Sequence, residues 1–173
     1  MQIEFAKIED KVLKGDFDII NEKVVQNEHE FFIIDSVNVS FRAYRIDVND
    51  VSIKEKINGD ITLICTNCLE EYKEHIELTS ETIFTRNKSY TGGEVTLTES
   101  ELDVQYLEDE VIDLKDEAIK TIDLYIPISH TCREDCKGIC PICGANKNLN
   151  PCDCKIEQPD PRLEKLKEFL NKE

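Results

Sequence analysis

The sequence predicts an α+β protein in which a helix covers an antiparallel β-sheet, with a C-terminal cysteine-rich module and a short terminal helix after it. Three observations support this fold. Apolar residues alternate with polar ones through most of the first half, and spacings of three and four residues begin near residue 111. Five cysteines then fall within residues 136–154. Strands that come before helices, without repeats, favour α+β over a wound parallel sheet.

The clearest strand signal runs from Val51 to Cys65, where apolar residues share one parity and only Glu55 and Gly59 break the pattern. Such alternation predicts a half-buried strand. Because Asn58-Gly59 is also a strong turn signal, a hairpin bent at that point is the alternative. The residues leave both open.

Two further alternating segments flank this one. Upstream, the alternation from Val37 changes parity after Ala43, which predicts a bulge there. Downstream, Tyr72 to Phe84 alternate again. Three adjacent strands predict an antiparallel sheet with one face exposed to solvent. For the first thirty residues we expect only a short strand followed by a loop.

Residues 85–110 predict a mobile acidic segment, because Thr91-Gly92-Gly93 is followed by a run of acids. A partner-binding acidic arm is the alternative. A helix over about residues 111–126 follows, capped by Asp109 or Asp113 and ended by Pro127. We expect its apolar stripe to cover the sheet; the stripe comprises Val111, Leu114, Ala118, Ile119, Ile122, Tyr125 and Ile126.

We expect the chain to divide into an α+β domain, residues 1–129, and a module with its own helix, residues 130–173. The second helix is indicated by "DPRLEKLKEFL", in which Asp160 suits the N-cap and Pro161 the first helical position. The cysteine-rich stretch lies between the two predicted helices.

Composition narrows the classes of function. No apolar run is long enough to span a membrane, and the N-terminus "MQIEFAKIEDKVLKGDFD" has no signal-peptide core, so we expect a cytoplasmic protein. The formal net charge of −16 repels phosphate backbones, so direct high-affinity RNA binding is not expected. The charge suits a basic protein partner, such as a ribosomal protein, although solubility alone also explains it.

Eight cysteines in a reducing compartment favour metal binding over disulfides. They form four close pairs, and structural zinc is commonly held by two such pairs. The CPxCG pair is the most specific zinc-knuckle signal, and we expect one site from Cys140, Cys143, Cys152 and Cys154. A second site, for one or two Zn²⁺ in all, would comprise Cys65, Cys68, Cys132 and Cys136. A site that joins Cys136 to Cys140 and Cys143 is the competing arrangement.

Other chemistry has weaker support. A redox CxxC needs a helix N-terminus after a βαβ-type strand, an iron–sulfur cluster could use the same thiolates, and catalytic zinc usually includes histidine or carboxylate. The three histidines show no ligand spacing with each other, although His130 lies two residues before Cys132. No phosphate-binding loop, dinucleotide motif or nucleophile elbow is present, so we predict no catalytic residue and no small-molecule substrate.

Three segments stand out together: Cys65-Thr66-Asn67-Cys68-Leu69, "CREDCKGICPICGANKNLNPCDC" from Cys132, and Asp160-Pro161-Arg162. In these segments the sequence resembles the YceD family of bacterial and plastid proteins. Asn146-Lys147-Asn148 departs slightly from the family's usual Asn-Leu-Asn. The family implies a role in large-subunit (23S) rRNA accumulation during ribosome biogenesis, with the cysteines as structural ligands and no established catalysis.

We therefore expect a non-enzymatic zinc-binding factor that acts through a basic ribosomal or assembly protein and touches rRNA indirectly, if at all. The alternatives are an rRNA-processing enzyme or nuclease cofactor, and a zinc-ribbon interaction module outside ribosome assembly.

Overall fold

The computed structural model describes residues 1–8, 12–26, 29–86 and 104–154. The chain forms two compact units. Unit 1 contains residues 1–64 and 71–128, and unit 2 contains residues 65–70 together with the chain from residue 129. The predicted terminal helix at residues 160–170 and most of the predicted acidic segment, residues 87–103, lie outside the described residues.

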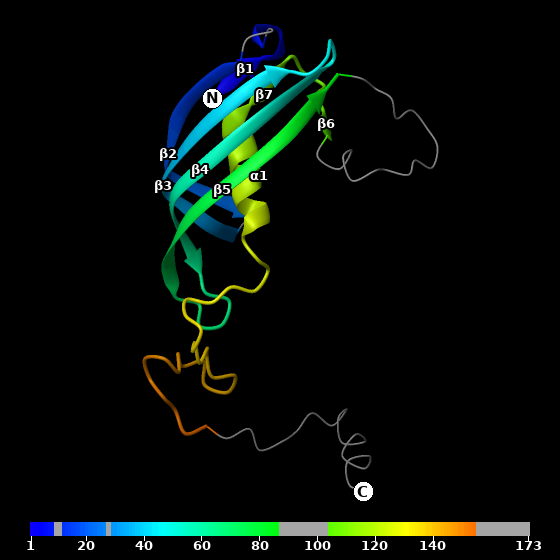
Figure 1. The fold of residues 1–173 in the computed structure, drawn as a ribbon. Coiled ribbons are helices and arrows are strands. Elements are labelled where there is room, and N and C mark those ends of the chain that lie inside the picture. Colours follow the sequence, from blue (N-terminus) through cyan, green and yellow to red (C-terminus); the bar gives the residue numbers. More distant parts are fainter. Residues whose placement is uncertain (9–11, 27–28, 87–103, 155–173) are drawn as a thin grey trace, which may run out of the picture. The chain divides into compact units, whose positions relative to one another are not determined.

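Unit 1 contains a five-stranded sheet in the order β2-β3-β4-β5-β6 (Figure 1). Four strands are antiparallel: β2 (Leu13–Gln26), β3 (His29–Arg45), β4 (Asp50–Ile64) and β5 (Glu71–Thr85). The short β6 (Val104–Tyr106) pairs with β5 in parallel, so the sheet is mixed and part of the predicted acidic loop is a strand.

The long strand β2 corrects the expectation of a loop in the first thirty residues. Phe17 and Ile19 turn towards the core, while the alternate residues Lys14, Asp16 and Asp18 are exposed. Gly15 interrupts the apolar pattern that would have revealed the strand. A Cβ at Gly15 would lie 3.0 Å from the ring of Phe41, so the aromatic ring occupies the missing side chain's place.

Strand β4 passes straight through Asn58-Gly59, so the hairpin alternative is wrong. The glycine is explained by a close approach to β3. A Cβ at Gly59 would lie 2.2 Å from the carbonyl oxygen of Ser36 and 2.7 Å from Cα of Val37. Only a residue without a side chain fits where β4 approaches β3 so closely.

The predicted bulge at Ala43 is also wrong. Ala43 and Tyr44 pair in regular register with Ile53 and Ser52, and the register shift lies earlier in β3, between Ile34 and Ser36. Tyr44 lies on the outer face of β3, whereas Ile46 and Val48 lie in the turn after the strand, and all three side chains are exposed.

A second, two-stranded sheet pairs β1 (Gln2–Glu4) with β7 (Val111–Asp113), and the 3-10 helix η1 (Phe5–Lys7) follows β1. The helix α1 (Leu114–Tyr125) begins directly after β7, three residues later than predicted. Its N-cap is Asp113, whose Oδ1 accepts from the backbone N–H groups of Lys115 at 3.0 Å and Asp116 at 3.4 Å.

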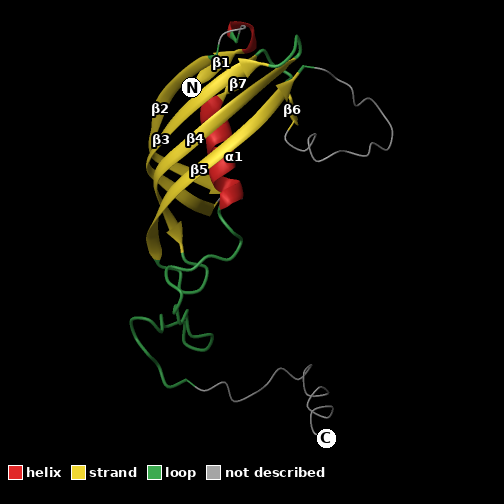
Figure 2. Ribbon diagram, in the orientation of Figure 1, coloured by secondary structure: helices red, strands yellow, loops and turns green. Residues whose placement is uncertain are grey.

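One face of α1 contributes to the core of unit 1. Ala118, Ile122 and Ile126 pack in the same cluster as Ile34 and Ile57 from the strands, and α1 lies along the sheet (Figure 2). A second cluster joins the N-terminal segment to β7 and the strands; it includes Ile3, Phe5, Ile8, Phe41, Ile53, Ile112 and Leu114. In the described part of the chain, α1 is too short and too polar to cross a bilayer.

Candidate metal centres

The described residues of unit 2, 65–70 and 129–154, form almost entirely loops and turns (Figure 2). Its cysteines form two clusters of four, one of Cys65, Cys68, Cys132 and Cys136, the other of Cys140, Cys143, Cys152 and Cys154. Within each cluster the Sγ atoms lie within 4.8 Å of one another. All eight thiols are free of disulfides.

Distances in the first cluster match tetrahedral coordination. The Sγ atoms of Cys65 and Cys136 lie 3.8 Å apart, and those of Cys68 and Cys132 lie 3.7 Å apart. Four thiolates at about 2.3 Å from one tetrahedral ion would place neighbouring sulfurs about 3.8 Å apart. The donor set and its spacing therefore fit a metal ion held by four thiolates.

The two CxxC turns share one backbone geometry. In the first turn the carbonyl of Cys65 accepts from the N–H of Leu69 at 2.9 Å, and its N–H donates to Glu70 at 2.9 Å. In the second turn the carbonyl of Cys140 accepts from Gly144, and its N–H donates to Ala145, both at 2.8 Å. The two knuckles are equivalent despite their different sequences.

The residue after each knuckle has a left-handed backbone. Gly144 has φ +71°, a value that glycine adopts readily. At the equivalent position Leu69 has φ +62°, which costs a residue with a side chain about 1 kcal/mol or more. The turn geometry therefore overrides the local preference at Leu69.

Backbone donors lower the pKa of the first cysteine in each knuckle. For Cys140, the N–H groups of Cys143 and Ile142 point at the sulfur and bring its pKa to about 6. For Cys65, burial acts to raise the pKa, but backbone N–H groups, chiefly that of Cys132, outweigh it and give about 6. Both thiols are thus prepared to be thiolates near neutral pH.

Two other cysteines in each cluster show the opposite shift, a raised pKa: Cys68 and Cys132 in the first, Cys152 and Cys154 in the second. Burial and the neighbouring thiol of Cys68 raise the pKa of Cys132 to about 12. The thiols of Cys143 and Cys152 raise the pKa of Cys154 to about 12. Four sulfurs so close together resist full deprotonation unless a cation shares their charge.

Two asparagines support the first cluster, and the residue pattern had not assigned them this role. Asn148 donates from Nδ2 to the sulfur of Cys136 at 3.4 Å, and this hydrogen bond is the main cause of that thiol's lowered pKa. The Oδ1 of Asn148 accepts from the N–H of Lys137 at 2.9 Å. Asn146 donates to the carboxylate of Glu70 at 3.1 Å and accepts from the N–H of Asn148. The polar sequence that connects Cys143 to Cys152 was the feature from which this supporting role could have been predicted.

The structure brings together the two groups of four that the sequence analysis favoured. The competing arrangement required Cys136 to lie with Cys140 and Cys143. In the structure Cys136 lies with Cys65 instead. His130 contributes its backbone carbonyl, which accepts from the N–H and the hydroxyl of Thr66 at 3.0 and 2.7 Å.

Comparison with known families matches residues 53–170 to the family described as large ribosomal RNA subunit accumulation protein YceD. The chain belongs to the YceD family. Uncharacterized proteins of Mycobacterium tuberculosis and Mycobacterium bovis are each 34% identical to this YceD protein over 109 residues, which is 63% of the chain and 50% of theirs. One from Mycobacterium leprae is 25% identical over 134 residues, 78% of the chain and 59% of its own. The chain thus spans about half the length of these curated relatives. No solved structure matches this YceD protein.

Proposed function

We propose that this protein is a non-enzymatic accessory factor of the cytoplasm that supports the accumulation or processing of 23S rRNA during ribosome biogenesis. The observation that carries the proposal is the family match over residues 53–170, which extends from β4 through both cysteine clusters. The shared feature is thus a sheet continuing into a cysteine-rich unit, and the proposed role belongs to that combination.

We further propose that each cluster holds one structural Zn²⁺. Four thiolates without histidine or carboxylate leave no open coordination position, which is the arrangement of structural rather than catalytic zinc. The support comes from the tetrahedral sulfur spacing of the first cluster and the N–H donors at Cys65 and Cys140. Because residues 65–70 and 129–154 have almost no regular secondary structure, bound metal would supply much of the free energy that folds them.

A basic ribosomal or assembly protein is the proposed partner. The formal net charge is −16, and exposed acids cluster in the turn of Glu108, Asp109 and Glu110 between β6 and β7. Surface potential of this sign speeds association with a positively charged partner and rejects other acidic proteins.

The test is depletion of the protein in its host, followed by sedimentation of ribosomal particles and measurement of 23S against 16S rRNA. We expect a loss of 23S rRNA and of large subunits, restored by the wild-type gene. Unchanged 23S rRNA and normal particles would refute the proposed role. Metal analysis of the purified protein should give two zinc ions per chain, and a count of zero would refute the zinc assignment.

A further inference from the structure

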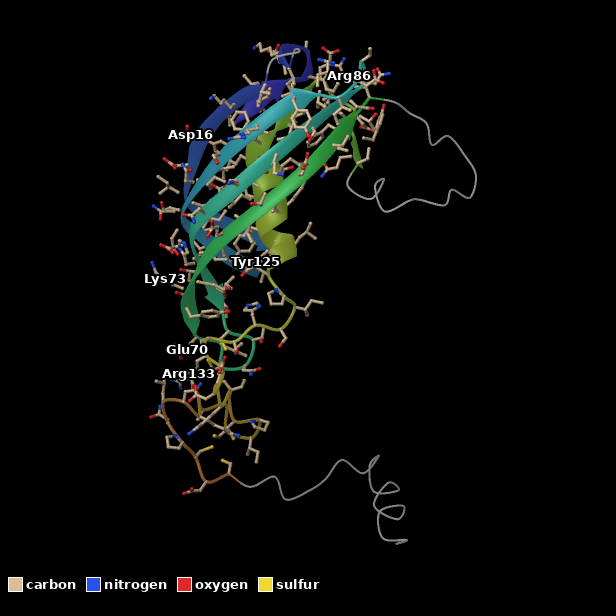
Figure 3. All side chains as sticks on the ribbon, in the orientation of Figure 1. Asp16, Glu70, Lys73, Arg86, Tyr125 and Arg133 are labelled. Atoms are coloured by element: carbon tan, nitrogen blue, oxygen red, sulfur yellow. The ribbon has the colours of Figure 1, made fainter. Side chains whose placement is uncertain are left out.

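A basic patch lies on the outer face of the five-stranded sheet. Lys14, Arg42 and Lys54 stand directly opposite one another on β2, β3 and β4, and Lys56 follows on β4. All four side chains are exposed. They line a hollow of about 600 Å³ together with Gly15, Asp16, Ser40 and Phe41; Figure 3 labels Asp16 on β2.

This arrangement is unfavourable for the isolated protein. Like charges directly opposite each other on neighbouring strands destabilise a sheet, and the row Lys14–Arg42–Lys54 contains two such pairs. The chain has 21 basic and 37 acidic residues, so the row does not follow from an excess of bases. An anionic ligand would relieve the repulsion.

The charges of the patch are poorly neutralised within the protein. Among the described residues, Lys14, Arg42 and Lys56 form no ion pair. Lys54 lies 3.4 Å from Glu81, but both side chains are nearly half exposed, so the pair is weak. The other oxygen of Glu81 accepts from the hydroxyls of Tyr44 at 2.7 Å and Ser52 at 3.0 Å, so Glu81 keeps partners when Lys54 turns to a ligand.

We propose that this patch binds the phosphodiester backbone of RNA. The inference rests on the proposed function, which brings the protein to rRNA, and adds a direct contact to it. Arginine and lysine are the usual phosphate ligands, and the hydroxyl of Ser40 offers a further donor. Neighbouring strands lie about 4.8 Å apart, so the row presents three cations in succession to one nucleic acid strand.

The chemistry of the hollow favours recognition of the backbone over the bases. Its aromatic residue, Phe41, is buried and offers no exposed ring for base stacking. Binding is therefore independent of sequence and sensitive to salt. Indirect RNA contact was predicted because the net charge of the whole chain is negative. The folded sheet, however, concentrates four cations at one place.

The test compares two triple variants of the full chain that have the same net charge. Lys14→Gln/Arg42→Gln/Lys56→Gln removes three of the four cations of the patch, and Lys7→Gln/Lys73→Gln/Lys115→Gln removes three cations elsewhere in unit 1. Binding to a labelled single-stranded RNA of about 20 nucleotides is followed by fluorescence anisotropy over a salt series. Circular dichroism checks that both variants fold.

We expect the patch variant to bind at least about 10-fold more weakly, with a salt slope reduced by about 2, while the matched control stays close to wild type. Equal losses in the two variants, or none in the patch variant, would overturn the proposal. Tight patch-dependent binding of poly-glutamate without binding of RNA would also overturn it, because the partner would then be an acidic protein.

Expression of both variants in depleted cells separates the inference from the proposed function. If wild type restores 23S rRNA and the patch variant does so equally while binding RNA normally in vitro, the inference fails and the function stands. If depletion leaves 23S rRNA unchanged while the patch binds RNA in vitro, the function fails and the contact stands.

Discussion

Glu55 is a buried carboxyl group whose ionisation should oppose folding. It sits on the core side of β4 between Ile53 and Ile57, opposite Phe41 on β3 and Ser80 on β5. Its exposure is 2%, and its Oε1 has no hydrogen-bond partner in the described part of the chain. Burial first, and the negative charge of Glu117 second, raise its pKa from 4.5 to about 7.

The sign of the pH dependence follows from the raised pKa. The folded state holds the Glu55 proton more tightly than the unfolded state, so folding is favoured below pH 4.5 and loses stability as the pH rises towards 7. A shift of that size corresponds to about 3 kcal/mol in total, of which about 2 kcal/mol is lost between pH 5.5 and 8. Glu55→Gln removes the ionisable proton and keeps the shape.

The assay is urea unfolding of wild type and Glu55→Gln across pH 5.5–8, followed by far-ultraviolet circular dichroism, which reports the sheet. We expect the stability of the variant relative to wild type to increase by about 2 kcal/mol over this range. Glu77→Gln, on the exposed outer face of β5, controls for the loss of one charge. Glu117→Gln should reduce the pH dependence of stability less than Glu55→Gln does, because burial is the larger cause of the raised pKa of Glu55. A difference that stays constant with pH would refute the reasoning.

Five more substitutions test the cysteine clusters and the glycines. Cys143→Ser should lower the zinc count from two to one and increase proteolysis of residues 129–154 while the circular dichroism of the sheet persists; loss of the sheet signal would contradict independent units. Asn148→Ala should weaken zinc affinity about 10-fold in a chelator competition, because it loses a donor to a ligand sulfur, whereas Asn150→Ala should bind like wild type. Gly59→Ala should cost about 3 kcal/mol or more in urea unfolding, because its Cβ would meet backbone, and Gly144→Ala only about 1 kcal/mol, because nothing lies within 4 Å; equal costs would contradict this explanation.

Local signals in the sequence were reliable where neighbouring residues produce the structure. The cap at Asp113, the end of the helix before Pro127 and the CPxCG knuckle all depend on hydrogen bonds within a few residues. The start of α1 was missed by three residues, because Val111–Asp113 pairs with the distant β1 instead of joining the helix. Pairing between strands that are far apart in the sequence produces no pattern in the neighbouring residues.

Glycines and outer-face residues misled the strand assignment for one reason. Gly15 and Gly59 break the apolar alternation because other strands or side chains occupy their space. Tyr44 continued an apolar pattern on the outer face, so it imitated a bulge that lies near Ser36 instead. In each case the missing information was the packing partner.

The sequence by itself determined the cysteine pairs, the amphipathic helix and the apolar alternation of the strands, because each depends on residues only a few positions apart. The tertiary structure decided which cysteine pairs lie together, that Glu55 is enclosed beside Glu117, and that Lys14, Arg42 and Lys54 form one row. These features depend on strand register and on turns that bring distant segments together. A net charge of −16 describes the whole chain, but only the fold determines where its cations meet.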